Sequence, residues 1–405
     1  MKVLQVIPNL AARTGGPPVA VVESSLALAR CGVETTIFAT DLAEAASAPS
    51  HARVTPGDLP QGAESLDVRL FPARWPQRLV FSPALWRAVH EQAPRHDVVH
   101  IHSLFLFPQF AAYRAARAAG VPYVVSARGA LDPYLRRRNR HLKAINDALW
   151  QRAMLADAAA LHLTSDEEAR LLRDVAPGVP RAVIPNGIRW ADYQALPPGQ
   201  EFRTRFLDGH DGPVVMYLGR LSHKKGLDVL VRAFAAVRRE VPDARLAIVG
   251  PDDEGLTPEL AALAVREGVA DAVTFTGMVR GRDKLAALAA ANVWALPSHS
   301  ENFGIAVAEA LAAGRAVVMS PGVNIAPEIA AASAGVVCEL TAEAFAASTV
   351  ALLRDDAGRA RYGQAGREFA RRYDWDAVAP QLADLYEGIA SGAPRAEAPE
   401  GRACA

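Results

Sequence analysis

The sequence predicts an α/β fold built from two Rossmann-like, doubly wound domains, each a parallel sheet covered by helices. Short runs rich in Val, Ile and Leu alternate with longer helical patterns, and this rhythm pauses near the middle of the chain and then restarts. A length of 405 residues also suits two domains better than one. A single large α/β domain is the alternative layout.

The first half of the chain contains the pattern of one such sheet. Its apolar runs predict strands at residues 2–7, 34–39, 97–101, 123–126, 158–161 and 181–184. Residues 17–30 and 108–119 carry the longer helical patterns. We expect this domain to span residues 1–195.

Residues 190–212 contain Pro197, Pro198 and three glycines, and they predict a linker or a domain junction. After it, strands are expected at residues 213–218, 245–249, 272–275, 292–296 and 316–319, and helices at 227–240, 285–290 and 303–313. The second domain is expected at residues 213–373, and the small, polar tail 391–405 is expected to be disordered. Two such domains predict a cleft that faces the carboxyl ends of both sheets.

Composition excludes several classes of protein. Hydrophobic residues make up 51% of the chain, so bulk disorder is excluded. Basic and acidic residues number 44 each, which argues against a nucleic-acid partner. No apolar run approaches the ~18 residues of a membrane span, and three scattered cysteines form no metal knuckle. We therefore expect a cytoplasmic protein, or one attached to a membrane surface.

The segment Gly219–Gly226 follows an expected strand and opens an expected helix. Backbone N–H groups at a helix start can hold a phosphate, and Arg220 and Lys225 would add two full charges. The chain has only five lysines, so the adjacent pair Lys224 and Lys225 is unusual. A solvated basic turn that only begins the helix is the alternative.

Two glutamates flank the start of the next helix. Glu301 lies on the loop at the carboxyl end of an apolar strand, where ligands bind, and Glu309 lies among alanines inside the helix. A carboxylate in such apolar surroundings needs a polar partner, and a diol such as a ribose can donate two hydrogen bonds to it. The alternative is one helix-terminal charge and one buried structural glutamate.

Weaker signals come from the first domain. Gly15 and Gly16 would let the backbone approach a ligand after the first strand, although no Gly-x-Gly-x-x-Gly fingerprint is present. Strand alternation puts His100 and His102 on one face, where a sugar or another polar ligand is a better partner than zinc, because no third metal ligand has a fitting spacing.

The segment 128–152 combines basic residues, among them Arg136–Arg138 and Lys143, with aromatic and aliphatic ones. Such a helix can rest on an anionic membrane surface. An ordinary solvated helix face is the alternative.

Taken together, these motifs resemble those of the retaining glycosyltransferases of family four, which have the GT-B fold. The resemblance rests on Gly219-Arg220-x(4)-Lys225-Gly226, on Gly250, and on Glu301-x(7)-Glu309. The stretches Asp97–His102, Val183–Gly187 and Tyr373–Trp375 also match, so the resemblance extends to about residue 390. A subgroup involved in bacterial surface polysaccharides has sequences close to His102–Phe105 and Ser126–Leu131, with small departures.

The resemblance implies a hexosyltransferase that transfers a sugar from a UDP- or GDP-sugar to a glycan or lipid-linked acceptor. It implies a role in the synthesis of lipopolysaccharide, capsule or exopolysaccharide. Neither a metal ion nor a cofactor is expected. It also implies that helix 374–390 completes the first domain. The implied catalytic residues are Glu301, His102, Arg220 and Lys225. The implied substrate-binding residues are Gly15, Gly16, His100, Arg128, Gly219, Met278, Val279, Asn302, Phe303, Gly304, Ile305 and Glu309. A sugar-nucleotide epimerase and a non-catalytic nucleotide-sugar binding protein remain alternatives. An NAD-dependent dehydrogenase is less favoured, because the glycine fingerprint is missing.

Overall fold

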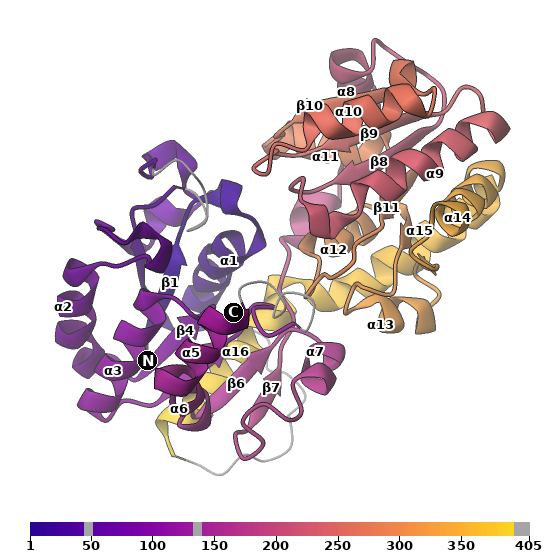
Figure 1. Ribbon diagram of the computed structural model, residues 1–405. Coiled ribbons are helices and arrows are strands. Elements are labelled where there is room, and N and C mark those ends of the chain that lie inside the picture. Colours follow the sequence, from indigo (N-terminus) through magenta and orange to yellow (C-terminus); the bar gives the residue numbers. More distant parts are fainter. Residues whose placement is uncertain (44–51, 133–139, 393–405) are drawn as a thin grey trace. The chain divides into compact units, whose positions relative to one another are not determined.

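The chain folds into two compact units, which are described separately below (Figure 1). The computed structural model describes residues 1–43, 52–132 and 140–392. Unit 1 consists of Met1–Gly187 together with Trp375–Ala405, and unit 2 consists of Ile188–Asp374. The second unit is therefore inserted into the chain of the first.

Unit 1 contains a parallel sheet with the strand order β3-β2-β1-β4-β5-β6-β7, which is seven strands within the described residues. The strands are β1 (Lys2–Asn9), β2 (Glu34–Thr40), β3 (Asp67–Phe71), β4 (Val98–His102), β5 (Tyr123–Ser126), β6 (Ala160–Leu163) and β7 (Arg181–Val183). The order reverses beside β1, as in Rossmann folds. The sequence did not predict β3, because its side chains are half-exposed or exposed and form no buried apolar run.

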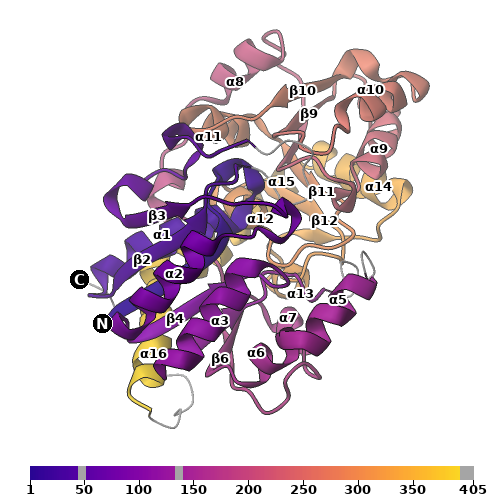
Figure 2. The same cartoon turned by 60° about the vertical axis from the view of Figure 1, so that its left-hand side comes forward.

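Helices cover both faces of this sheet (Figure 2). They are α1 (Gly16–Arg30), α2 (Pro83–Gln92), α3 (Phe107–Ala119), α5 (Arg140–Asn146), α6 (Arg152–Ala156), α7 (Asp166–Leu171) and α16 (Trp375–Ala390). Strand alternation divides the core between the two faces. Leu4 and Val99 pack with residues of α2 and α3, whereas their neighbours Val3 and Val98 pack with residues of α1 and α16.

Helix α16 comes from the far end of the chain and completes the core of unit 1. Trp375, Val378 and Tyr386 are buried against the sheet, and the indole N–H of Trp375 donates to Glu23 of α1 over 3.0 Å. Gly187 provides the room for this indole, because a Cβ there would lie 2.3 Å from Trp375 Cδ2. The buried residues of this helix are mostly apolar, so their burial stabilises unit 1.

Unit 2 has a second parallel sheet with the order β10-β9-β8-β11-β12-β13, six strands within the described residues. These are β8 (Val214–Leu218), β9 (Arg245–Val249), β10 (Val273–Gly277), β11 (Val293–Leu296), β12 (Ala316–Met319) and β13 (Val336–Val337). The prediction of two Rossmann-like parallel sheets is confirmed. Strands β8 and β11 are buried on both faces, which explains their continuous apolar runs.

The helices of unit 2 cover this sheet on both sides (Figure 1). They are α8 (Gly199–Phe206), α9 (Leu227–Glu240), α10 (Thr257–Arg266), α11 (Gly281–Ala290), α12 (Ile305–Ala312), α13 (Ala326–Ala331), α14 (Ala342–Arg354) and α15 (Asp356–Ala370). Helix α9 has the clearest amphipathic pattern. It buries Leu230, Phe234 and Val237 and leaves its arginines toward solvent.

The structure corrects the expected linker at residues 190–212. That segment contains a short 3-10 helix, Trp190–Tyr193, and helix α8, and both pack within unit 2. Phe202 is buried, and Arg203 donates to the carbonyls of Gly212 and Ala290. Pro198 and Gly199 begin helix α8 instead of marking a free linker. The chain passes between the units at Gly187–Ile188 and again at Asp374–Trp375.

Within the described parts of the chain, no helix combines the length and the apolar character that a membrane span requires. The expected tail, residues 391–405, lies almost entirely outside the described residues.

Candidate active site

The polar loops of unit 2 gather at one edge of its sheet. Because all paired strands are parallel, the segments that follow β8, β9, β10 and β11 all leave from the carboxyl edge. These segments contain Arg220 and Lys225, Gly250, Met278, and Glu301, in that order. The sequence motifs are therefore brought together by the topology of one sheet.

Three glycines allow these loops to touch. A Cβ on Gly250 would lie 1.9 Å from the carbonyl oxygen of Gly219, and a Cβ on Gly226 would lie 2.1 Å from that of Pro297. A Cβ on Gly322 would lie 2.4 Å from the carbonyl oxygen of Ser298. The N–H of His299 also donates to the carbonyl of Lys224 over 2.7 Å. The loop after β8 is thus fixed against the loop after β11.

This packing places Lys225 in an ion pair with Glu301. The ammonium contacts Glu301 Oε2, and each side chain is only 14% exposed. Burial lowers the pKa of Lys225 well below its usual value, and the nearby charges of Lys224 and Arg220 lower it further. The N–H of Glu301 donates to the carbonyl of Gly322 over 2.8 Å, so its backbone is fixed as well.

Glu309 lies in a second ion pair, with Lys284. The ammonium of Lys284, in the first part of α11, contacts Glu309 Oε1 in α12. The side chains of Lys284 and Glu309 are 29% and 12% exposed. No motif of the sequence predicted Lys284 as a site residue. Its signal was the scarcity of lysine, since only five of the 44 basic residues are lysines.

Arg220 is less tightly held than Lys225. Its side chain is 28% exposed, and its guanidinium lies 3.9 Å from the carboxylate of Asp253. Its carbonyl accepts a hydrogen bond of 2.7 Å from the Tyr217 hydroxyl, which fixes the backbone after Gly219. The guanidinium of Arg220 can therefore turn toward a bound anion without breaking a close ion pair.

Two helices begin at this edge without a side-chain cap. Helix α9 begins after Gly226 and α12 after Gly304, and both glycines have a left-handed backbone, with φ of +62° and +81°. Backbone N–H groups at such helix starts can bind phosphate oxygens. The segment Asn302–Ile305 enters α12 here. Phe303 itself is buried in a T-shaped contact with Tyr373, so only the backbone of this residue faces the site.

Met278 and Val279 follow β10. Met278 is 40% exposed, which is unusual for a large apolar side chain, whereas Val279 packs against the core of unit 2. Met278 therefore offers an apolar surface beside the site. The structure brings the predicted unit 2 residues to one edge of the sheet.

His100 and His102, which were expected to face a ligand, lie buried in the interior of unit 1. Their ring centroids are 4.0 Å apart, on the face that α16 covers, and each residue is 1% exposed. His100 contacts the Tyr386 hydroxyl and Ser126, and His102 contacts Gln5 and, more loosely, Arg128. Burial holds the pKa of both histidines well below its usual value, so they are neutral.

Arg128 links this interior to the carboxyl edge of the unit 1 sheet. Its guanidinium donates to Asn186 Oδ1 over 2.5 Å and to His102 Nδ1 over 3.3 Å. Burial lowers the pKa of Arg128 to about 10. Its Nε is buried and has no partner among the described residues. Among the unit 1 residues that the resemblance implies bind substrate, Arg128 is the cation.

Gly15 and Gly16 lie at the start of α1. Gly15 has φ of +118° and precedes a helix without a side-chain cap, which begins at Gly16 and has Pro17 as its second residue. Only glycine readily adopts the backbone of Gly15. The local backbone leaves room for the predicted approach to a ligand, which stays a prediction.

The proposed membrane segment is only partly covered by the structure. Arg136–Arg138 lie outside the described residues. Further along the segment, Ile145 and Leu149 are 55% and 74% exposed, and the ammonium of Lys143 lies over the Phe105 ring.

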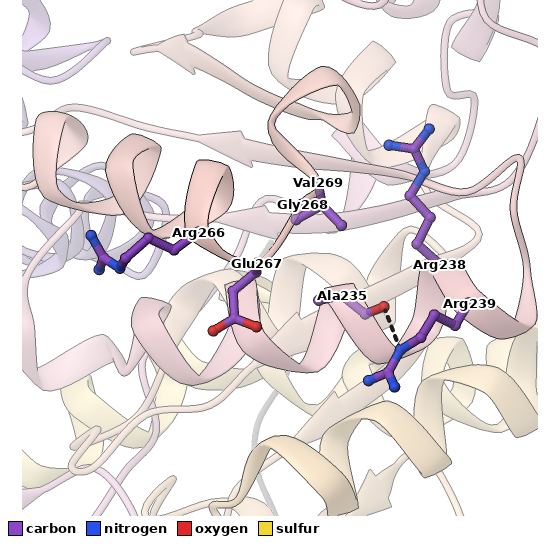
Figure 3. Close-up of a pocket in the computed structure, with 7 residues that line it drawn as sticks. All are labelled: Ala235, Arg238, Arg239, Arg266, Glu267, Gly268 and Val269. Carbon is purple, nitrogen blue, oxygen red and sulfur yellow. Dashed lines mark hydrogen bonds between the residues drawn. The ribbon is translucent and has the colours of Figure 1, made fainter.

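Two surface pockets lie elsewhere on unit 2. The first, of about 380 Å³, is lined by ends of α9 and α10, and Figure 3 shows its arginines pointing away from one another. Arg238 there pairs with Asp271. The second, of about 540 Å³, contains Arg315, which donates to backbone carbonyls such as that of Ala313, and Arg371, which lies over the Trp190 ring. Neither pocket contains the predicted site residues.

Comparisons with known proteins agree with this architecture. Residues 15–187 match the family described as "Glycosyl transferase 4-like domain", and residues 200–369 match "Glycosyl transferases group 1". A solved sucrose-phosphate synthase from Thermosynechococcus elongatus has a TM-score of 0.75 and 21% identity, over 97% of this chain and all of that chain. An Anabaena protein solved with UDP-glucose has a TM-score of 0.77 and 19% identity, over 96% of this chain and all of that chain. Both are similar in fold.

Curated relatives match most of the chain. A D-inositol 3-phosphate glycosyltransferase of Xylanimonas cellulosilytica is 32% identical over 92% of this chain and 91% of its own length. A phosphatidyl-myo-inositol mannosyltransferase of Mycobacterium leprae is also 32% identical, over 78% of this chain and 80% of its own length. With two matching family models and this identity along its length, the chain belongs to the group 1 glycosyl transferases of the GT-B fold.

Proposed function

We propose that this protein is a retaining glycosyltransferase that moves a sugar from a nucleoside-diphosphate sugar to a hydroxyl group of an acceptor. The observation that carries the proposal is the arrangement at the carboxyl edge of the unit 2 sheet. There, Arg220, Lys225 and two uncapped helix starts supply positive charge, and Glu301 and Glu309 supply carboxylates. A nucleoside-diphosphate sugar combines the matching groups, an anionic diphosphate and two sets of sugar hydroxyls.

Lys225 and Arg220 would bind the diphosphate. In the free protein Glu301 neutralises Lys225, and the diphosphate would replace that carboxylate as the partner of the ammonium. Glu301 would then accept hydrogen bonds from hydroxyls of the donor sugar. Glu309 would accept hydrogen bonds from the ribose hydroxyls, and Met278 would contact the base. These roles follow the family resemblance.

The proposed reaction breaks the bond between the anomeric carbon and the phosphate oxygen, and that oxygen keeps the bonding electron pair. Arg220, Lys225 and the N–H groups at the start of α12 stabilise the charge that develops on the diphosphate. The acceptor oxygen bonds to the anomeric carbon on the same face, and its proton passes to the leaving phosphate. The configuration is therefore retained, and the protein's cations serve in place of a metal ion.

The relatives' names favour an inositol phosphate or phosphatidylinositol as the acceptor class. The family resemblance of the sequence instead favours a lipid-linked or glycan acceptor of a bacterial surface polysaccharide. Arg128, the buried cation at the carboxyl edge of the unit 1 sheet, supports an acceptor that carries a phosphate in either case. We place the protein in the cytoplasm, in reach of the inner membrane face.

A transfer assay with labelled donors tests the proposal. UDP-, GDP- and ADP-sugars would each be offered with inositol 3-phosphate, phosphatidylinositol vesicles or a polyprenyl-linked oligosaccharide. Labelled product with the anomeric configuration of the donor supports the proposal, and its formation in EDTA supports metal independence. Conversion of the donor sugar without any acceptor would point to an epimerase. Tight donor binding without turnover on any acceptor would point to a binding protein.

A further inference from the structure

We propose that Lys284 is a positioning residue for the nucleotide ribose: it holds one oxygen of the Glu309 carboxylate and leaves the other oxygen to accept ribose hydroxyls. We infer further that this position requires lysine and would not function with arginine. The inference rests on the proposed function, because it assigns Lys284 to the donor site.

The two carboxylate oxygens of Glu309 have different surroundings. Lys284 Nζ contacts Oε1, and no hydrogen bond to Oε2 is found among the described residues. The Glu309 side chain is only 12% exposed, so the carboxylate needs a partner to remain in this position. The ammonium supplies that partner and fixes the side-chain torsions of Glu309 before a ligand arrives.

The choice of lysine is informative in this chain. Only five of its 44 basic residues are lysines, yet two of them pair with the two glutamates of the predicted site. Exposed glutamates of unit 2 pair with arginines instead, as Glu240 does with Arg354. A random placement of basic residues would favour arginine at position 284.

The same helix shows what arginine does to a carboxylate. Arg282 donates from Nε to Glu201 Oε2 over 2.8 Å and from a terminal nitrogen to Oε1 over 2.5 Å, so it occupies both oxygens. This is the usual forked geometry of a guanidinium with a carboxylate. An arginine at position 284 would engage both oxygens of Glu309 in the same way. The ribose hydroxyls would then have to compete with a guanidinium for them.

The test compares ribonucleotides with analogues that lack the hydroxyl groups. Dissociation constants of UDP, GDP and ADP, and of their 2′,3′-dideoxy counterparts, would be measured by calorimetry for the wild-type protein and Lys284→Arg. We expect Lys284→Arg to weaken binding of the preferred ribonucleotide about tenfold or more. Its affinity for the dideoxy analogue should change less than about twofold, which also shows that the variant is folded.

Arg282→Lys is the matched control, because it changes a basic residue two positions away on the same helix, in an exposed pair. It should leave both affinities unchanged. Equal ribonucleotide affinity in wild type and Lys284→Arg would overturn the inference, as would equal losses for both ligands. If the wild-type protein binds nucleotides but does not distinguish them from the dideoxy analogues, the inference fails while the proposed function stands. If it binds no nucleotide, both fail.

Discussion

At the scale of single residues, the Lys225–Glu301 pair links stability to binding. Lys225→Met leaves the mostly buried Glu301 carboxylate without its ammonium, and breaking such a pair from one side costs about 3 kcal/mol. We expect a lower free energy of unfolding and at least a tenfold weaker affinity for nucleoside diphosphates, since one of two phosphate-binding cations is lost.

The double variant Lys225→Met/Glu301→Gln separates the two effects. It removes the unpaired charge, so urea unfolding should recover much of the lost stability, while nucleotide binding stays weak. Arg232→Met is the control, because it removes a cation from the exposed surface of α9. Unchanged nucleotide affinity in Lys225→Met would contradict the assignment of Lys225 to the phosphate.

Single residues also mark the limit of prediction from sequence. Arg220, Lys225 and Glu301 could be predicted as candidates because they lie on loops that follow strands, and Glu309 because it is a carboxylate among alanines inside a helix. The scarcity of lysine draws attention to Lys284, but its role could not be predicted, because its partner Glu309 is 25 residues away and only the fold brings the two together. The burial of the histidines depends on α16, which no local pattern near His100 reveals.

At the scale of elements, a polar chain crosses the unit 1 sheet and holds three strands to α16. It runs from the Tyr386 hydroxyl through His100, Ser126 and His162 to the carbonyl of Ile184, with contacts of 2.6, 2.7, 2.8 and 2.9 Å. One consistent direction satisfies it. Each hydroxyl donates to a histidine Nδ1, and each histidine Nε2–H donates onward. Both rings are then neutral, because each Nδ1 accepts a hydrogen bond from a hydroxyl group and a proton on Nδ1 would point at that hydroxyl hydrogen.

The neutral, buried His162 of this hydrogen-bond network predicts that stability depends on pH. Burial lowers the pKa of His162 to about 3, whereas in the unfolded chain it returns to its ordinary 6.5. The unfolded state therefore binds more protons below pH 6.5, and stability is lost as the pH falls through that value. Between pH 7.5 and 5, His162 alone should lower the free energy of unfolding by about 2 kcal/mol.

Urea unfolding at both pH values measures this effect. His162→Gln, whose amide can replace one hydrogen bond but cannot titrate, should be less stable at pH 7.5 and should lose less stability at pH 5 than the wild-type protein. An identical loss in the two proteins would show that His162 is not the group responsible.

A second prediction at this scale concerns the contact between the loops that follow β8 and β11. Gly226→Ala would place a Cβ 2.1 Å from the carbonyl oxygen of Pro297, in a backbone with φ of +62°. The loops must move apart, so we expect nucleotide affinity to fall at least tenfold, with a lower melting temperature. Gly209→Ala is a matched control, because Gly209 has φ of +73° but open space at its Cβ. If both variants bind nucleotide equally well, the contact is not needed.

The alternation of strands and helices identified the sheets of both units, because buried parallel strands are continuous apolar runs. It failed at β3 and β13, where the side chains are partly exposed, and at residues 190–212, where helix α8 is short and rich in polar residues. Local pattern predicts an element when burial is uniform along it. Where tertiary contacts such as those of Phe202 and Arg203 stabilise a short helix, the sequence signal is weak.

At the scale of the whole molecule, the chain path makes the two units unequal. Unit 2 is continuous, and its ends meet, because the N–H of Ile188 donates to the carbonyl of Tyr373 over 2.7 Å. Unit 1 is split, and it needs α16 from the far end of the chain to cover Val3, Val98 and Val124. Unit 1 therefore cannot complete its core until residue 390 has been synthesised.

Expression of fragments tests this inequality. Residues 188–374 alone should fold cooperatively and, because they contain Arg220, Lys225, Lys284 and both glutamates, bind the same nucleoside diphosphate as the full chain. Residues 1–187 alone should be unfolded or aggregated, because the sheet face that α16 covers would be exposed to water. Joining residues 375–392 to that fragment by a short Gly/Ser linker should restore a cooperative transition in circular dichroism. A folded 1–187 fragment would show that unit 1 does not need α16 to fold. A 188–374 fragment that folds without binding nucleotide would show that unit 2 alone does not form the nucleotide site.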